Sequence, residues 1–353
     1  MEMYRKALQL AGEGRRFALG VVVDAQGSTP QKVGCKAIVD EMGATVGTLG
    51  GGRVEAQAFE RMREALDLGQ AAVSEHRLFD PYSRSAGPIC GGVMRILANP
   101  HMDQNLQIYR AALEALARGE QGVIATVVDN GDPDAIGSAT WVAEPDIDAS
   151  VGLCSADELR GALAGEGGRC VPGVDGASIY VEPVISPPRL LIVGGGHVGQ
   201  AVAVPACFLG FDTSVLDDRP EYTRAELFPP EATVICGDIP TEVERFPKGD
   251  RAYIVLVSKG HRPDAEALEV CIDSDVAYLG MMGSERKIRF IRKHFIESGL
   301  ATKEAFDRVV APIGVEIGAV TVQEIGVSIC AQLVAARRLK SASRPPVHAT
   351  SPK

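Results

Sequence analysis

The chain has 353 residues, 46% of them apolar and 23% charged, which is typical of a globular protein with two or three domains. Its formal net charge is −10 and no cluster of lysine or arginine offsets it, so nucleic acid and anionic membranes are not expected as partners. No apolar run approaches the roughly 20 residues that a membrane-spanning helix needs. Because the N-terminus also lacks the apolar core of a signal peptide, we expect a cytoplasmic protein that acts on small molecules or proteins.

The first half of the chain contains a repeated pattern. YRKALQLAGEGRRFALGVVVD from Tyr4 resembles YRAALEALARGEQGVIATVVD from Tyr109, and each predicts a helix, a polar link and a strand that ends in Val-Asp. Gly34 and Gly137 then open matching segments. We therefore expect an α/β domain with an internal duplication, its two layers sharing one sheet. The predicted domain covers residues 1–188, with repeats at 1–105 and 106–188.

Three glycine-rich segments occur only in the first repeat. They are GSTPQKVGCK at 27–36, GTLGGGRVE at 47–55 and SAGPICGG at 85–92. Consecutive glycines allow backbone amides to approach an anion or a flat ring closely. The second segment also leads into a predicted helix, whose N-terminus favours anions. Tight turns between strands would require similar glycines, so the pattern alone leaves both interpretations open.

Cys90 is the cysteine that stands out among eight, because it lies directly before Gly91 and Gly92. A thiol on a glycine-rich loop is accessible, and nearby backbone N–H groups favour the reactive thiolate. A buried structural cysteine is the alternative. The eight cysteines include no C-x-x-C pair, so the sequence predicts neither a zinc site nor a disulfide framework.

The second half begins with a dinucleotide-binding pattern. LLIVGGGHVGQAVA at 190–203 predicts a strand, a turn with G-x-G-x-x-G at Gly194, Gly196 and Gly199, and a helix. Gly194 allows a sharp turn, Gly196 allows close approach to a phosphate, and Gly199 allows the helix to pack close to the strand. A second predicted strand, TSVLD, ends in Asp217. These features predict a Rossmann-like domain over residues 189–340.

The residues after the second strand bear on which nucleotide would bind. Asp217 and Asp218 favour an unphosphorylated ribose, because a carboxylate accepts hydroxyl hydrogen bonds and repels a 2′-phosphate. Arg219 directly after them leaves NADP open as well as NAD. His197 lies at the phosphate end of the helix, where it would contact a ligand or only pack.

The rest of the second half alternates apolar runs with helical patterns, which predicts a doubly wound parallel sheet. The predicted strands cover residues 190–193, 213–217, 232–236, 252–257, 277–280 and 308–311. The predicted helices cover residues 198–210, 264–273, 284–297 and 321–339. The last helix has a capping box from Thr321 to Glu324.

Polar residues follow two of these strands. SKGHRPD places Ser258, Lys259 and His261 at the carboxyl edge of the sheet, where open α/β folds bind ligands. MMGSERK at 281–287 follows the next strand. No pattern identifies an acid or base for hydride transfer. ISPPR at 185–189 is the predicted domain boundary, and residues 341–353 are predicted to be a disordered tail.

Together these segments, with YLGMMGSERK and APIGVEIGAVTVQEIGVSICAQLV, resemble the xanthine dehydrogenase accessory protein family, also called XdhC/CoxI. The resemblance implies a chaperone that binds the molybdenum cofactor (molybdopterin) and supports its sulfuration by a cysteine desulfurase. It would then pass the cofactor to a molybdenum hydroxylase such as xanthine dehydrogenase, without necessarily turning over a substrate. Two residues depart from the family pattern: Gln31 replaces a common arginine and Cys35 a common alanine.

The resemblance also selects candidate site residues. The candidates for binding the molybdenum cofactor are Ser28, Gly50, Gly51, Gly52, Glu55, Cys90, Gly91 and Gly92. The candidates for binding NAD(P) or another nucleotide are Gly194, Gly196, His197, Gly199, Asp217, Asp218, Ser258, Lys259 and His261. No metal ligands and no catalytic residues are predicted.

Two other functions remain open at this point. One is an NAD(P)-dependent oxidoreductase whose first domain caps the substrate. The other is a binding module that docks on the hydroxylase under control of a nucleotide. A homodimer is expected from base rates alone.

Overall fold

The computed structural model describes residues 1–78, 91–100, 103–149, 152–165, 167–258 and 262–339. The chain divides into two units, Met1–Ser186 and Pro187–Lys353. The predicted tail at 341–353 and the candidates Cys90, Lys259 and His261 lie outside the described residues. Within the described part, no helix is both long and apolar enough to cross a membrane.

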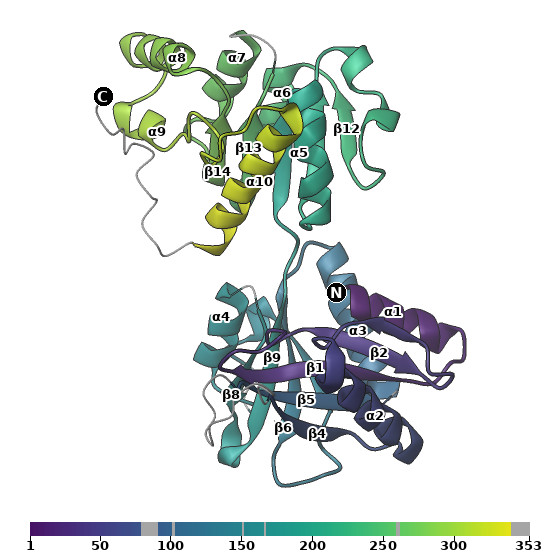
Figure 1. Ribbon diagram of the computed structural model, residues 1–353. Coiled ribbons are helices and arrows are strands. Elements are labelled where there is room, and N and C mark those ends of the chain that lie inside the picture. Colours follow the sequence, from purple (N-terminus) through teal and green to yellow (C-terminus); the bar gives the residue numbers. More distant parts are fainter. Residues whose placement is uncertain (79–90, 101–102, 150–151, 166, 259–261, 340–353) are drawn as a thin grey trace. The chain divides into compact units, whose positions relative to one another are not determined.

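The first half of unit 1 forms a five-stranded sheet covered by helices (Figure 1). The strand order is β3-β2-β1-β5-β4, and every neighbouring pair is antiparallel. Helix α2 covers one face through Val54, Ala58 and Met62, which pack on buried strand residues such as Val22 and Ile96. The elements are α1 (Glu2–Gly12), β1 (Phe17–Gln26), β2 (Lys36–Asp40), β3 (Thr45–Gly47), α2 (Gly52–Leu68), β4 (Ala72–Arg77) and β5 (Val93–Pro100).

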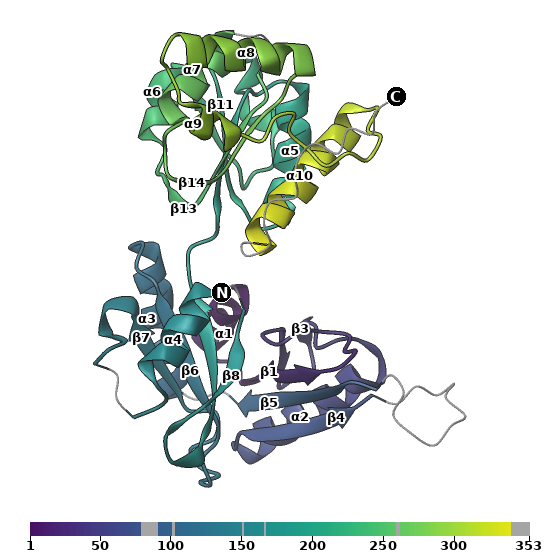
Figure 2. The ribbon, with the colours of Figure 1, turned by 90° about the vertical axis from the view of Figure 1, so that its left-hand side faces the viewer.

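The second half of unit 1 forms a separate four-stranded sheet in the order β7-β6-β9-β8, again antiparallel throughout. Its elements are α3 (Asp103–Ala117), β6 (Gly122–Asp129), β7 (Ala139–Ala143), α4 (Ala156–Ala164), β8 (Arg169–Pro172) and β9 (Ser178–Val184). Both sheets of unit 1 can be followed in Figure 2.

The two sheets repeat one topology. In each, a helix is followed by two paired strands, a second helix and two more strands, so that β2-β1-β5-β4 matches β7-β6-β9-β8; the first sheet has β3 as an additional edge strand before its second helix. The register of β1 slips between Val22 and Asp24, and that of β6 slips between Val127 and Asp129. The expectation of one shared sheet is wrong, because the described strands of each half pair within their own sheet, and side chains from both halves form a common apolar cluster.

Unit 2 contains the predicted doubly wound parallel sheet, in the order β12-β11-β10-β13-β14. The chain builds outward from β10 to β12 and then crosses to β13 on the other side of β10. The order therefore reverses between β10 and β13, the position at which open α/β sheets bind ligands. The strands are β10 (Arg189–Val193), β11 (Asp212–Asp217), β12 (Thr233–Cys236), β13 (Gly249–Leu256) and β14 (Val276–Met281).

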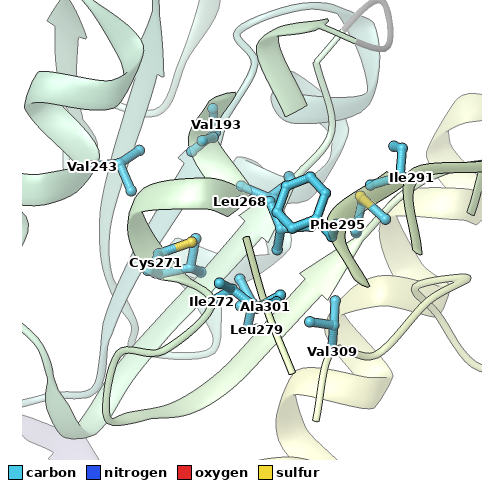
Figure 3. Close-up of a cluster of buried hydrophobic side chains, with 14 of the residues drawn as sticks. Val193, Val243, Leu268, Cys271, Ile272, Leu279, Ile291, Phe295, Ala301 and Val309 are labelled. Carbon is cyan, nitrogen blue, oxygen red and sulfur yellow. The ribbon is translucent and has the colours of Figure 1, made fainter. Parts of the chain in front are cut away.

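Helices cover both faces of this sheet. On one face α5 and α10 lie side by side, and Gly326 of α10 packs directly on the backbone of Ala201 (Figures 1 and 2). On the other face a buried cluster includes Val193 from β10, Leu268 from α7 and Phe295 from α8 (Figure 3). The helices are α5 (His197–Phe208), α6 (Ile239–Arg245), α7 (Arg262–Cys271), α8 (Glu285–Glu297), α9 (Lys303–Asp307) and α10 (Val322–Arg338).

Most predicted elements of unit 2 are confirmed, with one correction and two omissions. The predicted strand at 308–311 is wrong: Val310 makes only an isolated parallel bridge to Gly280. The short helices α6 and α9 were not predicted. The predicted capping box is confirmed, since the Thr321 hydroxyl accepts from the N–H of Glu324 and the Glu324 carboxylate accepts from the N–H of Thr321.

Candidate functional site

Segments 27–36 and 47–55, together with Gly91 and Gly92 of the third glycine-rich segment, meet beside one end of the five-stranded sheet. Segment 27–36 touches segment 47–55, because a Cβ on Gly50 would lie 2.7 Å from Cγ of Pro30. It also touches the start of β5, because a Cβ on Gly92 would collide with the carbonyl oxygen of Ser28. The structure therefore brings together candidates that are more than 60 residues apart in the sequence.

The turn before α2 depends on glycine for its backbone conformation. Gly50, Gly51 and Gly52 have φ angles of +126°, +73° and +61°, a region that residues with a side chain rarely adopt. A Cβ on Gly51 or Gly52 would meet nothing within 4 Å, so the space beside the turn is open. Gly51 is the N-cap of α2 and Gly52 its first residue, and the N-terminus of a helix favours an anion.

Glu55 fixes this turn from the first turn of α2. Its Oε1 accepts hydrogen bonds from the Thr48 hydroxyl at 2.6 Å and the N–H of Leu49 at 2.7 Å. The same Thr48 oxygen accepts from the N–H of Gly50 at 3.2 Å. The Thr48 hydroxyl, together with backbone N–H groups of the turn, lowers the pKa of Glu55 below its ordinary value. Glu55 is therefore an anchor of the turn in its ionised form.

Gly91 and Gly92 have a different role from the turn glycines. A Cβ on Gly91 would collide with the carbonyl of Leu78, and one on Gly92 would come within 2.8 Å of the carbonyl of Gln26. Both positions therefore require glycine because the chain approaches itself closely there. Ser28 is exposed beside them.

Three contacts that the sequence did not predict hold the 27–36 segment. The Cys35 thiol donates to the Gln31 side-chain oxygen at 3.0 Å, so the two residues that depart from the family pattern touch each other. The Lys36 ammonium group donates to the Gly34 carbonyl at 3.1 Å and forms a buried ion pair with Glu182 of β9 at 2.6 Å. Since Lys36 and Glu182 are 146 residues apart, no local pattern could have identified this pair.

In unit 2 two of the fingerprint glycines, Gly194 and Gly199, are required because a side chain at either position would clash with neighbouring backbone. A Cβ on Gly194 would lie 2.7 Å from both N and Cα of Ser258, where β13 ends. A Cβ on Gly199 would collide with the Gly194 carbonyl, which explains the close packing of α5. Gly196, the N-cap of α5, has open space around it, and His197 after it is exposed.

Asp217 lies at the end of β11 with 1% of its surface exposed, and Asp218 next to it is exposed. Asp217 accepts from the N–H of Gly195 at 2.8 Å and forms a salt bridge with Arg219. Burial alone would raise the pKa of Asp217, but the hydrogen bonds from Arg219 and Gly195 outweigh it, so the pKa lies below its ordinary value. Asp217 thus lies beside the glycine turn, where Gly195 and Arg219 bind its carboxylate.

A buried ion pair joins the two motifs that follow β13 and β14. Asp264, which is fully buried, accepts from the N–H of Ser258 at 3.1 Å and from the Lys287 ammonium group at 2.5 Å. Burial raises the pKa of Asp264 despite these partners. Ser258 is therefore 6% exposed and engaged by the protein itself. Asp264 and Lys287 stand in the motifs SKGHRPD and MMGSERK, but no sequence pattern pairs them.

A cavity of about 590 Å³ lies elsewhere in unit 1, between α2 and β4. Its lining includes Ser74 and His76, whose side chains are 2.8 Å apart, and Arg61. None of the candidate site residues lines it. Among the described residues no group of His, Cys, Asp and Glu is arranged to hold a metal ion, and the seven described cysteines form no disulfide.

Comparisons with known proteins match both units. Residues 10–77 match the model of the "XdhC and CoxI family", and residues 190–333 match that of the "XdhC Rossmann domain". The uncharacterized protein YqeB of Escherichia coli K12 is 25% identical over 335 residues, which cover 95% of this chain and 46% of YqeB. The chain therefore spans about half the length of that relative.

Two further proteins match along nearly their whole length. A Bacillus subtilis protein named as a probable xanthine dehydrogenase subunit is 23% identical over 334 residues, covering 91% of this chain and 93% of that protein. A crystal structure from Bacillus halodurans, described as a xanthine dehydrogenase, aligns with a TM-score of 0.76 at 22% identity and covers 97% of this chain and 98% of its own. At that identity the structural match supports the fold alone.

The two family models together cover more than half of the chain and fall on separate units, one on the glycine-rich turns of unit 1 and one on the parallel sheet of unit 2. The chain belongs to the XdhC and CoxI family.

Proposed function

We propose that this protein is an accessory protein that binds the molybdenum cofactor and passes it to a molybdenum hydroxylase of the xanthine dehydrogenase type. The observation that carries the proposal is the meeting of segments 27–36 and 47–55 with Gly91 and Gly92, beside an open turn at the N-terminus of α2. Family membership and the name of the Bacillus subtilis relative support the link to xanthine dehydrogenase.

The chemistry of the cofactor suits this receptor. Molybdopterin is flat, carries many hydrogen-bonding groups and ends in a phosphate. The open space beside Gly51 and Gly52 allows a flat group to approach the backbone, and the N-terminus of α2 favours the phosphate. The ionised Glu55 keeps the turn in one conformation before the ligand arrives, which lowers the ordering cost of binding.

The finer steps are part of the same proposal. Cys90 precedes Gly91 in the sequence, and we assign its thiol to the cofactor site. While the cofactor is held, a cysteine desulfurase supplies the terminal sulfido ligand of the molybdenum, and the hydroxylase then takes the cofactor. The protein acts as a cytoplasmic homodimer, and the pterin is cargo rather than a resident cofactor.

The proposal is tested by pterin binding. Purified wild-type protein is incubated with molybdenum cofactor under anaerobic conditions, separated from free cofactor, and assayed for pterin by oxidation to its fluorescent derivative. We expect the wild type to retain pterin and Glu55→Ala to retain about one tenth as much at limiting cofactor, since the turn loses its anchor. Cys90→Ala is measured in parallel and is expected to weaken retention as well.

Glu60→Ala is the matched control, because Glu60 is an exposed glutamate on the same helix and is expected to leave retention unchanged. A wild-type protein that neither retains nor binds pterin at micromolar concentration would contradict the proposed function. Equal retention by the Glu55→Ala and Glu60→Ala proteins would move the site away from the α2 turn.

A further inference from the structure

A parallel sheet with a G-x-G-x-x-G turn implies NAD or NADP as a cofactor, held by its pyrophosphate at the turn and by its adenine ribose at an acid that ends the second strand. In this chain the turn is Gly194 to Gly199 and the acid is Asp217 at the end of β11. Whether NAD fits therefore depends on whether the carboxylate of Asp217 is free to accept the ribose hydroxyl groups.

The carboxylate of Asp217 has no accepting capacity left. Its Oδ2 accepts from the N–H of Gly195 at 2.8 Å and from Nη2 of Arg219 at 2.9 Å. Its Oδ1 accepts from the N–H of Arg219 at 3.1 Å and from Nε of the same side chain at 2.8 Å. A carboxylate offers about four lone-pair sites. The side chain is also only 2% exposed, so a ribose would have to break these bonds to reach it.

The backbone after β11 covers the turn that the ribose would approach. A Cβ on Gly195 would collide with the carbonyl oxygen of Tyr222, and Gly195 is buried. The guanidinium group of Arg219 lies over the Tyr222 ring, 4.1 Å from its centre. Arg219 is therefore held from two sides, by the carboxylate of Asp217 and by the ring of Tyr222, rather than being free to move away.

Asp218 does not replace Asp217. Its side chain is 54% exposed, and the contact between it and the protein is a 3.7 Å approach to Nε of Arg219. It lies one residue beyond the end of β11, whereas Asp217 accepts from the N–H of Gly195. The acid bonded to the glycine turn is thus the buried one.

We infer that unit 2 does not bind NAD or NADP, because Asp217 acts as a positioning residue that ties the glycine turn to Arg219, and because the Tyr222 carbonyl packs against Gly195 of the same turn. Gly194 and Gly199 of the fingerprint maintain the packing of β10, α5 and β13, and the turn does not form an adenine dinucleotide site. Without NAD or NADP, the protein would lack the cofactor that an NAD(P)-dependent oxidoreductase needs. Pterin binding by unit 1 is independent of this inference, which concerns unit 2 alone.

Titration of the purified full-length protein with NADH and with NADPH tests the inference, with nucleotide fluorescence and calorimetry as readouts. We expect no saturable binding of either nucleotide, with any Kd above about 1 mM. Saturable binding of either nucleotide to the wild type at micromolar concentration overturns the inference, whatever the variants do.

The positioning role of Asp217 is tested without a nucleotide, by the thermal midpoints of Asp217→Asn and Asp218→Asn. We expect the first to melt several degrees below the wild type and the second to melt with it, because Asp217 is the acid engaged by the turn. Equal midpoints for the two variants would contradict the positioning role. If Asp217→Asn does not fold, the same loss is expected in milder form from Arg219→Lys, which keeps the charge but loses the paired contact.

Discussion

The turn at residues 50–52 and the turn at residues 194–196 both lead into a helix, and each is fixed by a carboxylate, Glu55 in one and Asp217 in the other. In the first, all three glycines have positive φ, but two of them have open space around them. In the second, only Gly194 has positive φ, whereas Gly194, Gly195 and the nearby Gly199 have no room for a Cβ.

The difference shows that glycine serves two purposes that look alike in a sequence. Where glycine is needed for its backbone conformation and the space stays open, a ligand can reach the backbone amides. Where it is needed because another part of the chain occupies that space, the position belongs to the packing of the protein. The first case supports a ligand site in unit 1. In unit 2 the crowding at Gly194 and Gly199 is the packing that the fold requires, and the observation that argues against a dinucleotide is the Tyr222 carbonyl against Gly195.

The largest effect that this comparison predicts is for Gly199→Ala. A Cβ there collides with the Gly194 carbonyl, so either α5 or the turn must move, at a cost of about 3 kcal/mol. Gly196→Ala is the control, because its site is open and its φ is −68°, and it should cost less than about 1 kcal/mol. Denaturant unfolding followed by circular dichroism measures both. Similar losses for the two variants would mean that crowding does not explain the fingerprint.

Asp217→Asn comes next in size. The amide that replaces one carboxylate oxygen would face the donors of Gly195 or Arg219, leaving a buried donor without an acceptor, and we expect a loss of about 2 kcal/mol. The exposed neighbour gives the control, since Asp218→Asn should stay within about 0.5 kcal/mol of the wild type. The measurement is the free energy of unfolding at neutral pH.

The same pair predicts a pH dependence. The pKa of Asp217 is lowered in the folded protein, so its stabilising contribution is complete above its unfolded pKa of about 3.9 and is lost as the pH falls through the lower folded value. The stability difference between wild type and Asp217→Asn should therefore be constant from pH 7 to about pH 5 and shrink below about pH 4. Asp264 changes the stability with pH in the opposite direction, because burial raises its pKa. Both proteins contain Asp264, so its contribution cancels in the stability difference between them. A difference that does not change with pH would contradict an ionised Asp217.

The sequence predicted unit 2 well because its signals are local. Buried parallel strands appear as short apolar runs, and the capping box of Thr321 and Glu324 marks the start of the last helix. The missed helix α6 also had a local signal, since Asp238 caps it and Pro240 lies in its first turn. The strand predicted at 308–311 failed because an apolar run alone does not specify a hydrogen-bonded partner.

The sequence predicted which segments of unit 1 matter but not how they are held. The duplication stays a prediction, although the two sheets share one strand order. The ion pair of Lys36 with Glu182 and the contact of Gly92 with Ser28 join positions far apart in the chain, so no window of sequence reveals them. The contact of the Tyr222 carbonyl with Gly195 likewise forms only in the folded chain, so the sequence does not predict it.

Gly51→Ala tests the open turn and should have a smaller effect on stability than the changes in unit 2. Its φ of +73° disfavours a side chain by about 1 kcal/mol, but no neighbour would be displaced. If the open space beside Gly51 receives the pterin, the same variant should retain clearly less pterin than its stability loss explains. Gly69→Ala is the control, because Gly69 has a similar φ of +67° and open space at the other end of α2. Equal pterin retention by the two variants would contradict a ligand at Gly51.

The smallest effect on stability is expected for Thr48→Val, which removes one exposed hydroxyl and should cost about 0.5 kcal/mol. Its effect on Glu55 is more specific: the Thr48 hydroxyl is the largest cause of the lowered pKa of Glu55, so the pKa should rise toward its ordinary value in the variant. Carbon NMR titration of the Glu55 carboxyl group measures this shift. Thr45→Val, the same change on the neighbouring exposed strand, should leave the titration unchanged. If Glu55 titrates identically in all three proteins, the Thr48 hydroxyl does not anchor it, and the open turn must be held by the backbone N–H groups alone.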